Sequence, residues 1–199
     1  MTFADRSPDI QLRRIEPGDG HTLRAARLRG LAEAPEAFGQ TSLEAEARPE
    51  EEWHRTARAG ASGDQRAWFL AEMAATTHGM AATSPAKPEV ASLARPEVVG
   101  LVLGRRRPPD TVMVFSMWVD PTVRRLGVGR RLIEAVETWA KAWGATQTVL
   151  WVFASNEPAL RFYTRLGFSV IAVGPDADAG YQYGATAMTR PIPSPAPAG

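Results

Sequence analysis

Two closely spaced glycines, Gly127 and Gly129, separate a continuous apolar segment from an amphipathic one. The apolar segment, residues 112–119, is typical of a strand that is covered on both faces. After the glycines, Leu132 and the apolar residues that follow it lie on one stripe, which predicts a helix that ends near Gly144. This part of the chain is therefore expected to form a strand, a tight glycine turn and a helix, in that order.

Four arginines flank these glycines, two on each side, at Arg124, Arg125, Arg130 and Arg131. A helix N-terminus already carries partial positive charge, so acidic neighbours would be the favourable ones there. Glycines let the backbone approach an anion closely, the N–H groups of the first turn point toward it, and guanidinium groups add charge and paired donors. The segment therefore indicates a binding site for an anion such as a pyrophosphate. The alternative is a glycine-rich turn with solvated arginines.

Two common phosphate-binding motifs do not fit this segment. A dinucleotide-binding turn needs a third glycine or an alanine where this chain has Leu132, and an acidic residue about 20 residues further on, where this chain is apolar. A P-loop needs Lys followed by Ser or Thr after its last glycine, and this chain has Arg130 and Arg131 there. The segment is therefore either a pyrophosphate site of a different kind or the glycine-rich turn with solvated arginines.

The rest of the chain alternates between short apolar strands and amphipathic helices. Strands are expected at residues 10–15, 67–73, 97–104, 112–119, 148–153, 168–173 and 182–190. Helices are expected around residues 23–31, from residue 49 onward, after residue 131 and over residues 156–166. This order predicts an α/β (α+β) fold, a mixed sheet with helices on both faces. We expect one domain over residues 1–190, with a flexible loop at 75–96 and a disordered tail at 191–199.

Composition argues against several classes of protein and of site. The chain has no cysteine, and its histidines, His21, His54 and His78, are scattered without metal-ligand spacing, so no metal site is expected. A net charge of +1 argues against a nucleic-acid-binding protein. The N-terminal residues lack the apolar run of a signal peptide, and no apolar run approaches the length of about 20 residues that a membrane helix needs. We expect a cytoplasmic protein that does not bind membranes.

Two motifs in this order resemble the GNAT superfamily of N-acetyltransferases. The family signature Gln/Arg-x-x-Gly-x-Gly/Ala is matched by residues 124–129, RRLGVG. Its second element is an Asn after the next strand, then a helix with a Tyr, then Leu-Gly-Phe, matched here by Asn156, Tyr163 and residues 166–168. The resemblance is specific over residues 115–168 and looser over residues 10–190. It implies a GNAT fold, in which a mostly antiparallel mixed sheet splays apart between the fourth and fifth strands.

The resemblance implies acetyl-CoA as the cosubstrate. Its pyrophosphate is expected on the segment Arg124, Arg125, Leu126, Gly127, Val128, Gly129 and Arg130. Its pantetheine arm is expected to pair like an added strand with Met117, Trp118 and Val119. The side-chain amide of Asn156 would hold the cosubstrate, although Asn is also a good helix N-cap, and both interpretations can hold together.

The resemblance also suggests catalytic groups. Tyr163 would protonate the leaving thiolate, and its alternative is an aromatic side chain of the core. Backbone N–H groups near Trp118, freed by a strand bulge, would stabilise the oxyanion. Many relatives carry a Glu on the strand before the glycine turn, where this chain has Ser116 between Phe115 and Met117. The base is therefore open: Ser116 could order a water, or Glu44 or Glu46 could reach the site.

On the acceptor side, Phe38 would line the substrate pocket, and its alternative is a hydrophobic plug. The tryptophans Trp118, Trp139, Trp143 and Trp151 are expected in the core.

The predicted function is acetyl transfer from acetyl-CoA to a primary amine of a small molecule or peptide, by direct attack in a ternary complex. The missing cysteine excludes an acetyl-cysteine intermediate. The alternative is a non-catalytic acyl-CoA-binding sensor or regulator. A third hypothesis is that the protein binds nucleic-acid phosphates through its arginines, and the near-neutral net charge argues against this function. Homodimers are common among relatives, but no residue here decides the assembly.

Overall fold

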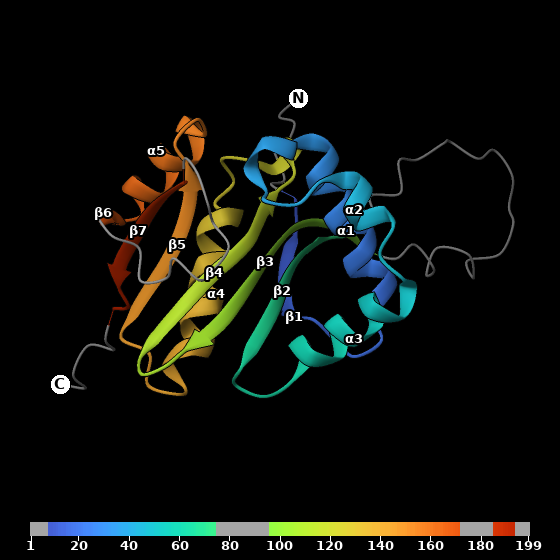
Figure 1. The fold of residues 1–199 in the computed structure, drawn as a ribbon, viewed down its shortest axis with the longest axis horizontal. Helices are drawn as coiled ribbons and strands as arrows, with labels where there is room; N and C mark the ends of the chain where they lie inside the picture. The colour runs from blue at the N-terminus through green and yellow to red at the C-terminus, as the bar shows by residue number, and fades with distance from the viewer. Residues whose placement is uncertain (1–7, 75–95, 172–184, 194–199) are drawn as a thin grey trace, which may run out of the picture.

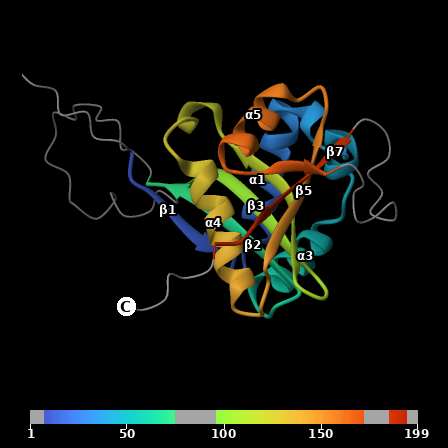
Figure 2. The ribbon, with the colours of Figure 1, turned by 90° about the vertical axis from the view of Figure 1, so that its left-hand side faces the viewer.

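The computed structural model describes residues 8–74, 96–171 and 185–193, and in these the chain forms a seven-stranded sheet with helices on both faces (Figure 1; Figure 2). The strands are β1 Ile10–Arg14, β2 Arg66–Met73, β3 Glu97–Arg107, β4 Thr111–Val119, β5 Gln147–Phe153, β6 Ser169–Ile171 and β7 Ala185–Pro191. The helices are α1 Gly20–Glu33, α2 Ser42–Glu46, α3 Glu50–Ala61, α4 Val128–Lys141 and α5 Glu157–Arg165, with 3-10 turns η1 Pro35–Ala37 and η2 Pro121–Val123. The predicted α/β mixed sheet is confirmed.

The sheet has the strand order β1-β2-β3-β4-β5-β7-β6. All its neighbouring strands are antiparallel except β4 and β5, which are parallel. The pairing of β4 with β5 runs only from Thr111 and Gln147 to Val114 and Leu150. Beyond Val114 the two strands diverge, so the splay expected between the fourth and fifth strands is confirmed.

A layer of helices packs on each face of the sheet and explains the continuous apolar runs in the sequence. On β2, Ala67 and Phe69 face the core that α4 and α5 cover. The alternate residues Trp68 and Leu70 face the core that α1 and α3 cover. Because successive side chains of a strand point to opposite faces, a strand between two cores is apolar at every position.

The structure differs from the sequence-based expectation in two places. The sequence did not predict α2, which begins with a capping box in which Thr41 and Glu44 satisfy each other's backbone N–H groups. Residues 191–193 of the predicted tail belong to the fold, because Pro191 pairs with Gln147 in the sheet and Ile192 is 7% exposed in the core. Residues 75–95 of the predicted loop and residues 194–199 of the predicted tail lie outside the described residues.

A buried ion pair joins α4 to β7. Arg190 donates to both carboxylate oxygens of Glu137, at 2.8 and 2.7 Å, and Thr148 Oγ1 donates to the same carboxylate at 2.8 Å. Glu137 is only 4% exposed. A buried charge that loses a charged hydrogen-bond partner is costly, because the remaining charge stays desolvated.

We expect Glu137→Gln to lower the free energy of unfolding by about 2 kcal/mol, because it leaves the largely buried Arg190 guanidinium without a counter-charge. Urea unfolding at neutral pH measures the change. The matched control is Glu134→Gln on the same helix, whose side chain is 53% exposed, and which should change stability little. Equal effects of the two substitutions would contradict the importance of the buried pair.

In the part of the chain that the structure describes, none of the helices has both the length and the apolar character needed to span a bilayer.

Candidate functional site

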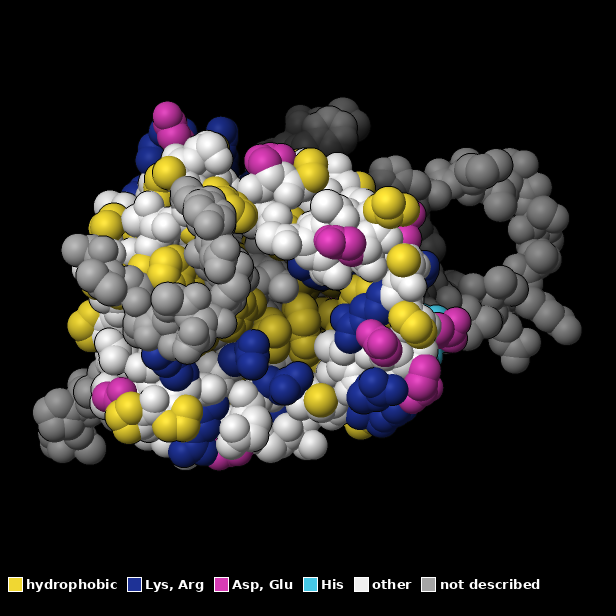
Figure 3. Space-filling view, in the orientation of Figure 1, with side chains coloured by type: hydrophobic (Ala, Val, Ile, Leu, Met, Phe, Trp, Pro, Cys, Tyr) yellow, Lys and Arg dark blue, Asp and Glu magenta, His cyan; other side chains and the backbone are white. Residues whose placement is uncertain are grey.

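A cleft of about 450 Å³ opens where β4 and β5 diverge. Its walls come from those two strands, from α5 and its N-cap, from α1 and the segment that follows it, and from the start of β7. Its lining residues are Arg27, Ala37, Phe38, Gly39, Gln40, Val114, Phe115, Ser116, Met117, Leu150, Trp151, Val152, Phe153, Asn156, Ala159, Tyr163 and Ala185. In Figure 3, this face of the molecule shows a hollow with hydrophobic side chains at its floor and Lys or Arg side chains along its lower edge.

Strand β4 carries a bulge where it borders the cleft. Its Trp118 is paired with Leu101 of β3, but the next pair is Phe115 with Leu103, so two residues of β4 lie opposite one of β3. Those residues are Ser116 and Met117, and Ser116 has a φ of 52°, a left-handed conformation that is uncommon for serine. Bulges often occur next to active sites, where they redirect side chains and interrupt the regular pairing. A strand bulge near Trp118 was an expectation of the sequence analysis, but its position along the strand could not be predicted.

After the bulge, the backbone N–H and C=O groups of successive β4 residues point alternately toward β3 and toward the open side of the strand. The N–H of Asp120 donates to the carbonyl of Val99 on β3 at 2.9 Å. Because hydrogen-bonded positions alternate in an antiparallel ladder, the main-chain groups of Trp118 also face β3, and those of Val119 face away from it. The backbone of Val119 thus points to the open side, and the pairing of an added strand with Met117, Trp118 and Val119 stays a prediction.

The Trp118 side chain belongs to the core. It is 5% exposed, and its ring lies against Gly30 of α1, where an added Cβ would come within 3.0 Å of it. Its indole N–H donates to Glu33 at 3.2 Å. The expectation that Trp118 is a core residue is therefore confirmed, whereas Trp151 lines the cleft instead.

The glycine segment forms an uncapped helix N-terminus. Gly127 is the N-cap of α4 with a φ of 79°, and Arg125 also has a left-handed φ, of 71°. The first intrahelical bond runs from the N–H of Arg131 to the carbonyl of Gly127, so the N–H groups of residues 128–130 precede it. The first turn has no acidic residue and no side-chain cap. Backbone N–H groups that converge in this way, together with the helix dipole, form an anion-binding cradle.

The four arginines around the glycines have different roles. Arg131 donates to the carbonyl of Ile10 at 2.8 Å and so holds β1. Arg124 donates to the carbonyl of Val119 at 3.0 Å and to Glu33 at 2.5 Å, which ties the segment to α1. Arg125 and Arg130 are exposed at the cradle. All four arginines are exposed, but Arg124 and Arg131 are tied to other parts of the fold by these bonds, whereas Arg130 pairs within α4, with Glu134 at 4.0 Å.

The cradle lies beside the cleft but does not line it. A Cβ added to Gly129 would lie 2.9 Å from the Phe162 ring and 3.3 Å from the end of Met117, which itself lines the cleft. Of the predicted site residues, the structure brings Phe38, Ser116, Met117, Asn156 and Tyr163 to the cleft wall. It does not place there Trp118, Val119, Arg124, Arg125, Leu126, Gly127, Val128, Gly129 or Arg130.

Tyr163 and Asn156 face the cleft from α5. Tyr163 is 6% exposed, and its ring makes edge contacts with Phe162 and Phe168 at centroid distances of 5.1 and 5.5 Å. Burial raises the pKa of the Tyr163 phenol well above its ordinary value, so the hydroxyl keeps its proton at neutral pH. Asn156 Oδ1 accepts from the N–H of Ala159 at 3.1 Å, which confirms the N-cap interpretation of Asn156. Its side chain also lines the cleft.

The acceptor side of the cleft contains groups that the sequence analysis missed. The Arg27 guanidinium lies 4.3 Å from the Phe38 ring centre and donates to Gln40 at 3.4 Å, and Arg27 is 8% exposed. A charged residue within the apolar stripe of α1 is the signal that could have indicated it. Neither Glu44 nor Glu46 lines the cleft, and the Glu44 carboxylate instead accepts from Thr41. The expectation that one of these glutamates reaches the site finds no support.

Asp120 fixes the end of β4 next to the glycine segment. It is 9% exposed and accepts from Thr122 Oγ1 at 2.6 Å and from Arg29 of α1 at 2.5 Å. Burial alone would raise the pKa of this carboxyl, but the hydrogen bonds from Thr122 and Arg29 outweigh it and hold the pKa below its ordinary value. A lowered carboxyl pKa stabilises the fold above the unfolded-state pKa of about 3.9 and stops doing so as the pH falls through the folded value.

We therefore expect Asp120→Asn to be less stable than the wild type at pH 7, with a difference that shrinks as the pH falls below about 3.9. Urea unfolding at pH 7 and at strongly acidic pH measures both quantities. Glu46→Gln, a substitution at an exposed residue away from this cluster, is the control and should show a small difference at both pH values. A stability difference for Asp120→Asn that stays constant with pH would contradict the assignment.

Comparison with known proteins agrees with this geometry. A family model described as the acetyltransferase (GNAT) family matches residues 42–168. The chain belongs to this family. The match covers the strand, the glycine turn and α4, as well as α5 with Asn156 and Tyr163. The resemblance stated from the two motifs is confirmed, and the chain carries an acyltransferase domain of the GNAT type.

Individual proteins of known sequence or structure are also similar to this chain. A mycothiol acetyltransferase of Thermobispora bispora is 30% identical over 161 residues, which is 80% of this chain and 46% of that protein. The chain thus spans about half the length of this relative. A GNAT-family acetyltransferase of Staphylococcus aureus Mu50 has a similar structure, with a TM-score of 0.66 at 15% identity over 93% of this chain and all of that one. PaiA N-acetyltransferase of Thermoplasma acidophilum, solved in complex with coenzyme A, gives 0.62 at 13% identity over 92% and 99% of the two chains.

Proposed function

We propose that the protein transfers an acetyl group from acetyl-CoA to a primary amine by direct attack within a ternary complex. The observation that carries the proposal is the position of the uncapped N-terminus of α4 beside the cleft between β4 and β5, with Tyr163 in the cleft wall. A structure of similar fold was determined with coenzyme A, which supports the choice of cosubstrate. Acetyl-CoA supplies an activated thioester, and the protein residues bind and orient it.

The residues present fit such a cosubstrate. The N–H groups of Val128, Gly129 and Arg130 would hold the pyrophosphate, because they precede the first intrahelical bond. The exposed side chains of Arg125 and Arg130 would add charge. The extended pantetheine arm would follow the free edge of β4 past the bulge, and the side-chain amide of Asn156 would help to hold it from α5.

In the transfer step, the amine nitrogen bonds to the carbonyl carbon and the carbon–sulfur bond breaks. The leaving thiolate takes a proton from the Tyr163 hydroxyl, which regains one from solvent. Because burial keeps Tyr163 neutral, it is a hydrogen donor at neutral pH. Because the raised pKa makes the phenol a weaker acid, Tyr163 first donates a hydrogen bond to the leaving sulfur, and it passes on its proton as solvent returns one to it.

The attacking amine loses its proton to water. Among the described residues that line the cleft there is no carboxylate, so none of these side chains can act as a carboxylate base. The bulge exposes Ser116 to the cleft, where its hydroxyl can order a water that relays the proton to solvent. The acceptor amine would enter from the side of Phe38, as a small molecule or as part of a peptide.

A sensor that binds acyl-CoA without catalysis is the second candidate, and the missing carboxylate is the observation that favours it. Thiol release from acetyl-CoA, measured with a panel of small amines and of peptides with a free N-terminus, separates the two candidates. We expect amine-dependent thiol release with at least one acceptor class. Tight acetyl-CoA binding by calorimetry without any amine-dependent release would overturn catalysis in favour of the sensor. Absence of binding would overturn both.

A further inference from the structure

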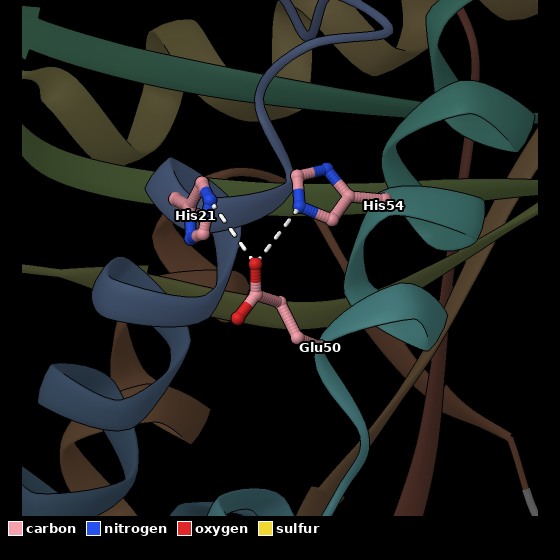
Figure 4. Close-up of side chains that lie close together, drawn as sticks. All are labelled: His21, Glu50 and His54. Carbon is pink, nitrogen blue, oxygen red and sulfur yellow. Dashed lines mark ion pairs between the residues drawn. The ribbon is translucent and has the colours of Figure 1, made fainter.

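Two of the histidines meet a glutamate at the N-terminal ends of α1 and α3. His21 is the second residue of α1, and Glu50 and His54 lie four residues apart on α3. Figure 4 shows both imidazole rings turned toward the Glu50 carboxylate. His21 Nε2 lies 3.3 Å and His54 Nε2 lies 3.5 Å from the same carboxylate oxygen, Oε1. The expectation from sequence that the histidines are scattered is therefore wrong for this pair, which the packing of α1 on α3 brings together.

The spacing of these three atoms matches a metal coordination shell. No two of the candidate ligand atoms of His21, Glu50 and His54 are more than 4.8 Å apart. Two ligands that each lie about 2.0–2.1 Å from a tetrahedral Zn²⁺ are about 3.3–3.4 Å apart. The two distances to Glu50 Oε1 thus already have the value that shared coordination requires, and a small rotation of exposed side chains would bring in the third pair.

The backbone of α1 makes room for one of the ligands. A Cβ added to Gly20 would lie 2.3 Å from Nδ1 of His54, so only glycine allows this imidazole to rest on the start of α1. The His54 side chain is 24% exposed as a result, whereas those of His21 and Glu50 are 67% and 65% exposed. The cluster is therefore supported on one side and open to solvent on the other, which leaves space for water as a fourth ligand.

We propose that His21, Glu50 and His54 form a binding site for a divalent transition-metal ion, with Zn²⁺ as the ion that best fits two imidazoles, one carboxylate and a water. An ion held there joins α1 to α3, the two helices that cover one face of the sheet. The ligands lie outside the cleft lining, so the proposal does not depend on acetyl transfer. The competing interpretation is that Glu50 only accepts hydrogen bonds from the two imidazoles.

Calorimetric titration of the full, tag-free chain with Zn²⁺ tests the site. We expect one ion per chain, and about tenfold or greater weakening of binding in His21→Ala, His54→Ala and Glu50→Gln, because each removes one of three protein ligands. Glu51→Gln, in the same helical turn, makes the same charge change outside the cluster. This control variant should bind Zn²⁺ as the wild type does.

A further test variant keeps all three ligands but crowds one of them. Gly20→Ala crowds the His54 ring and should weaken Zn²⁺ binding while leaving the folded state intact by circular dichroism. Binding only to the folded chain should also raise the wild-type Tm by about 5–10 °C at a Zn²⁺ concentration about 100 times the Kd. The visible absorption of bound Co²⁺ should intensify as in four-coordinate sites. The proposal is overturned if no stoichiometric binding occurs, or if His21→Ala, His54→Ala and Glu50→Gln bind like the Glu51→Gln control.

Discussion

Tyr163→Phe should lower kcat by about 100-fold or more and leave the Kd for acetyl-CoA almost unchanged, because a positioned proton donor typically contributes about 10²–10⁴ in rate. The substitution removes only the hydroxyl. The ring stays, together with its contacts to Phe162 and Phe168, so the cleft wall and the fold should be preserved. Steady-state thiol release with the best acceptor amine measures kcat, and calorimetry measures the Kd.

Two further measurements decide how this result is interpreted. Thermal unfolding should show a Tm within a few degrees of the wild type, because no buried contact of the ring is lost. Ser116→Ala is the companion variant, because it removes a hydroxyl from the part of the cleft wall that β4 forms. It should reduce kcat less, since water can still occupy the space. An unchanged kcat in Tyr163→Phe would remove Tyr163 from the acid role and leave it as a packing residue.

Much of the fold could be predicted because the spacing of apolar residues within one segment shows which of its faces are buried. Trp68 and Phe69 are both apolar since each faces its own core, and the same holds along the buried part of β4. Helix α2 left no periodic pattern, because five residues make little more than one turn. Its only signal was the pair Thr41 and Glu44, which became meaningful once the capping bonds were seen.

The candidate site was only partly predictable, because long-range partners decide what each residue does. The motifs located the glycine turn and Tyr163, since those roles depend on local order along the chain. Arg124 and Arg131 looked equivalent to their neighbours until the fold placed Glu33 and Ile10 beside them, at sequence separations of 91 and 121 residues. Similarly, the left-handed φ of Ser116 follows from how β4 pairs with β3 while it leaves β5, which the serine itself does not encode.

Gly129→Val should weaken acetyl-CoA binding by about 100-fold or more, which corresponds to about 2.7 kcal/mol. A Cβ at this position would lie 2.9 Å from the Phe162 ring, so the ring must move, and the two added methyl groups would project over the first turn of α4. The N–H groups that should hold the pyrophosphate lie in that turn, so the anion would lose several donors at once.

The control for this substitution is Glu134→Val, which introduces the same β-branched side chain at an exposed position of the same helix. It should reproduce any general loss of helix stability without changing the Kd for acetyl-CoA. Gly129→Ala, with only the Cβ, should give an intermediate Kd because Phe162 can partly give way. Calorimetry measures each Kd below the Tm of each variant. Wild-type affinity in Gly129→Val would mean that the diphosphate does not lie on the start of α4, because a valine there leaves no space for both.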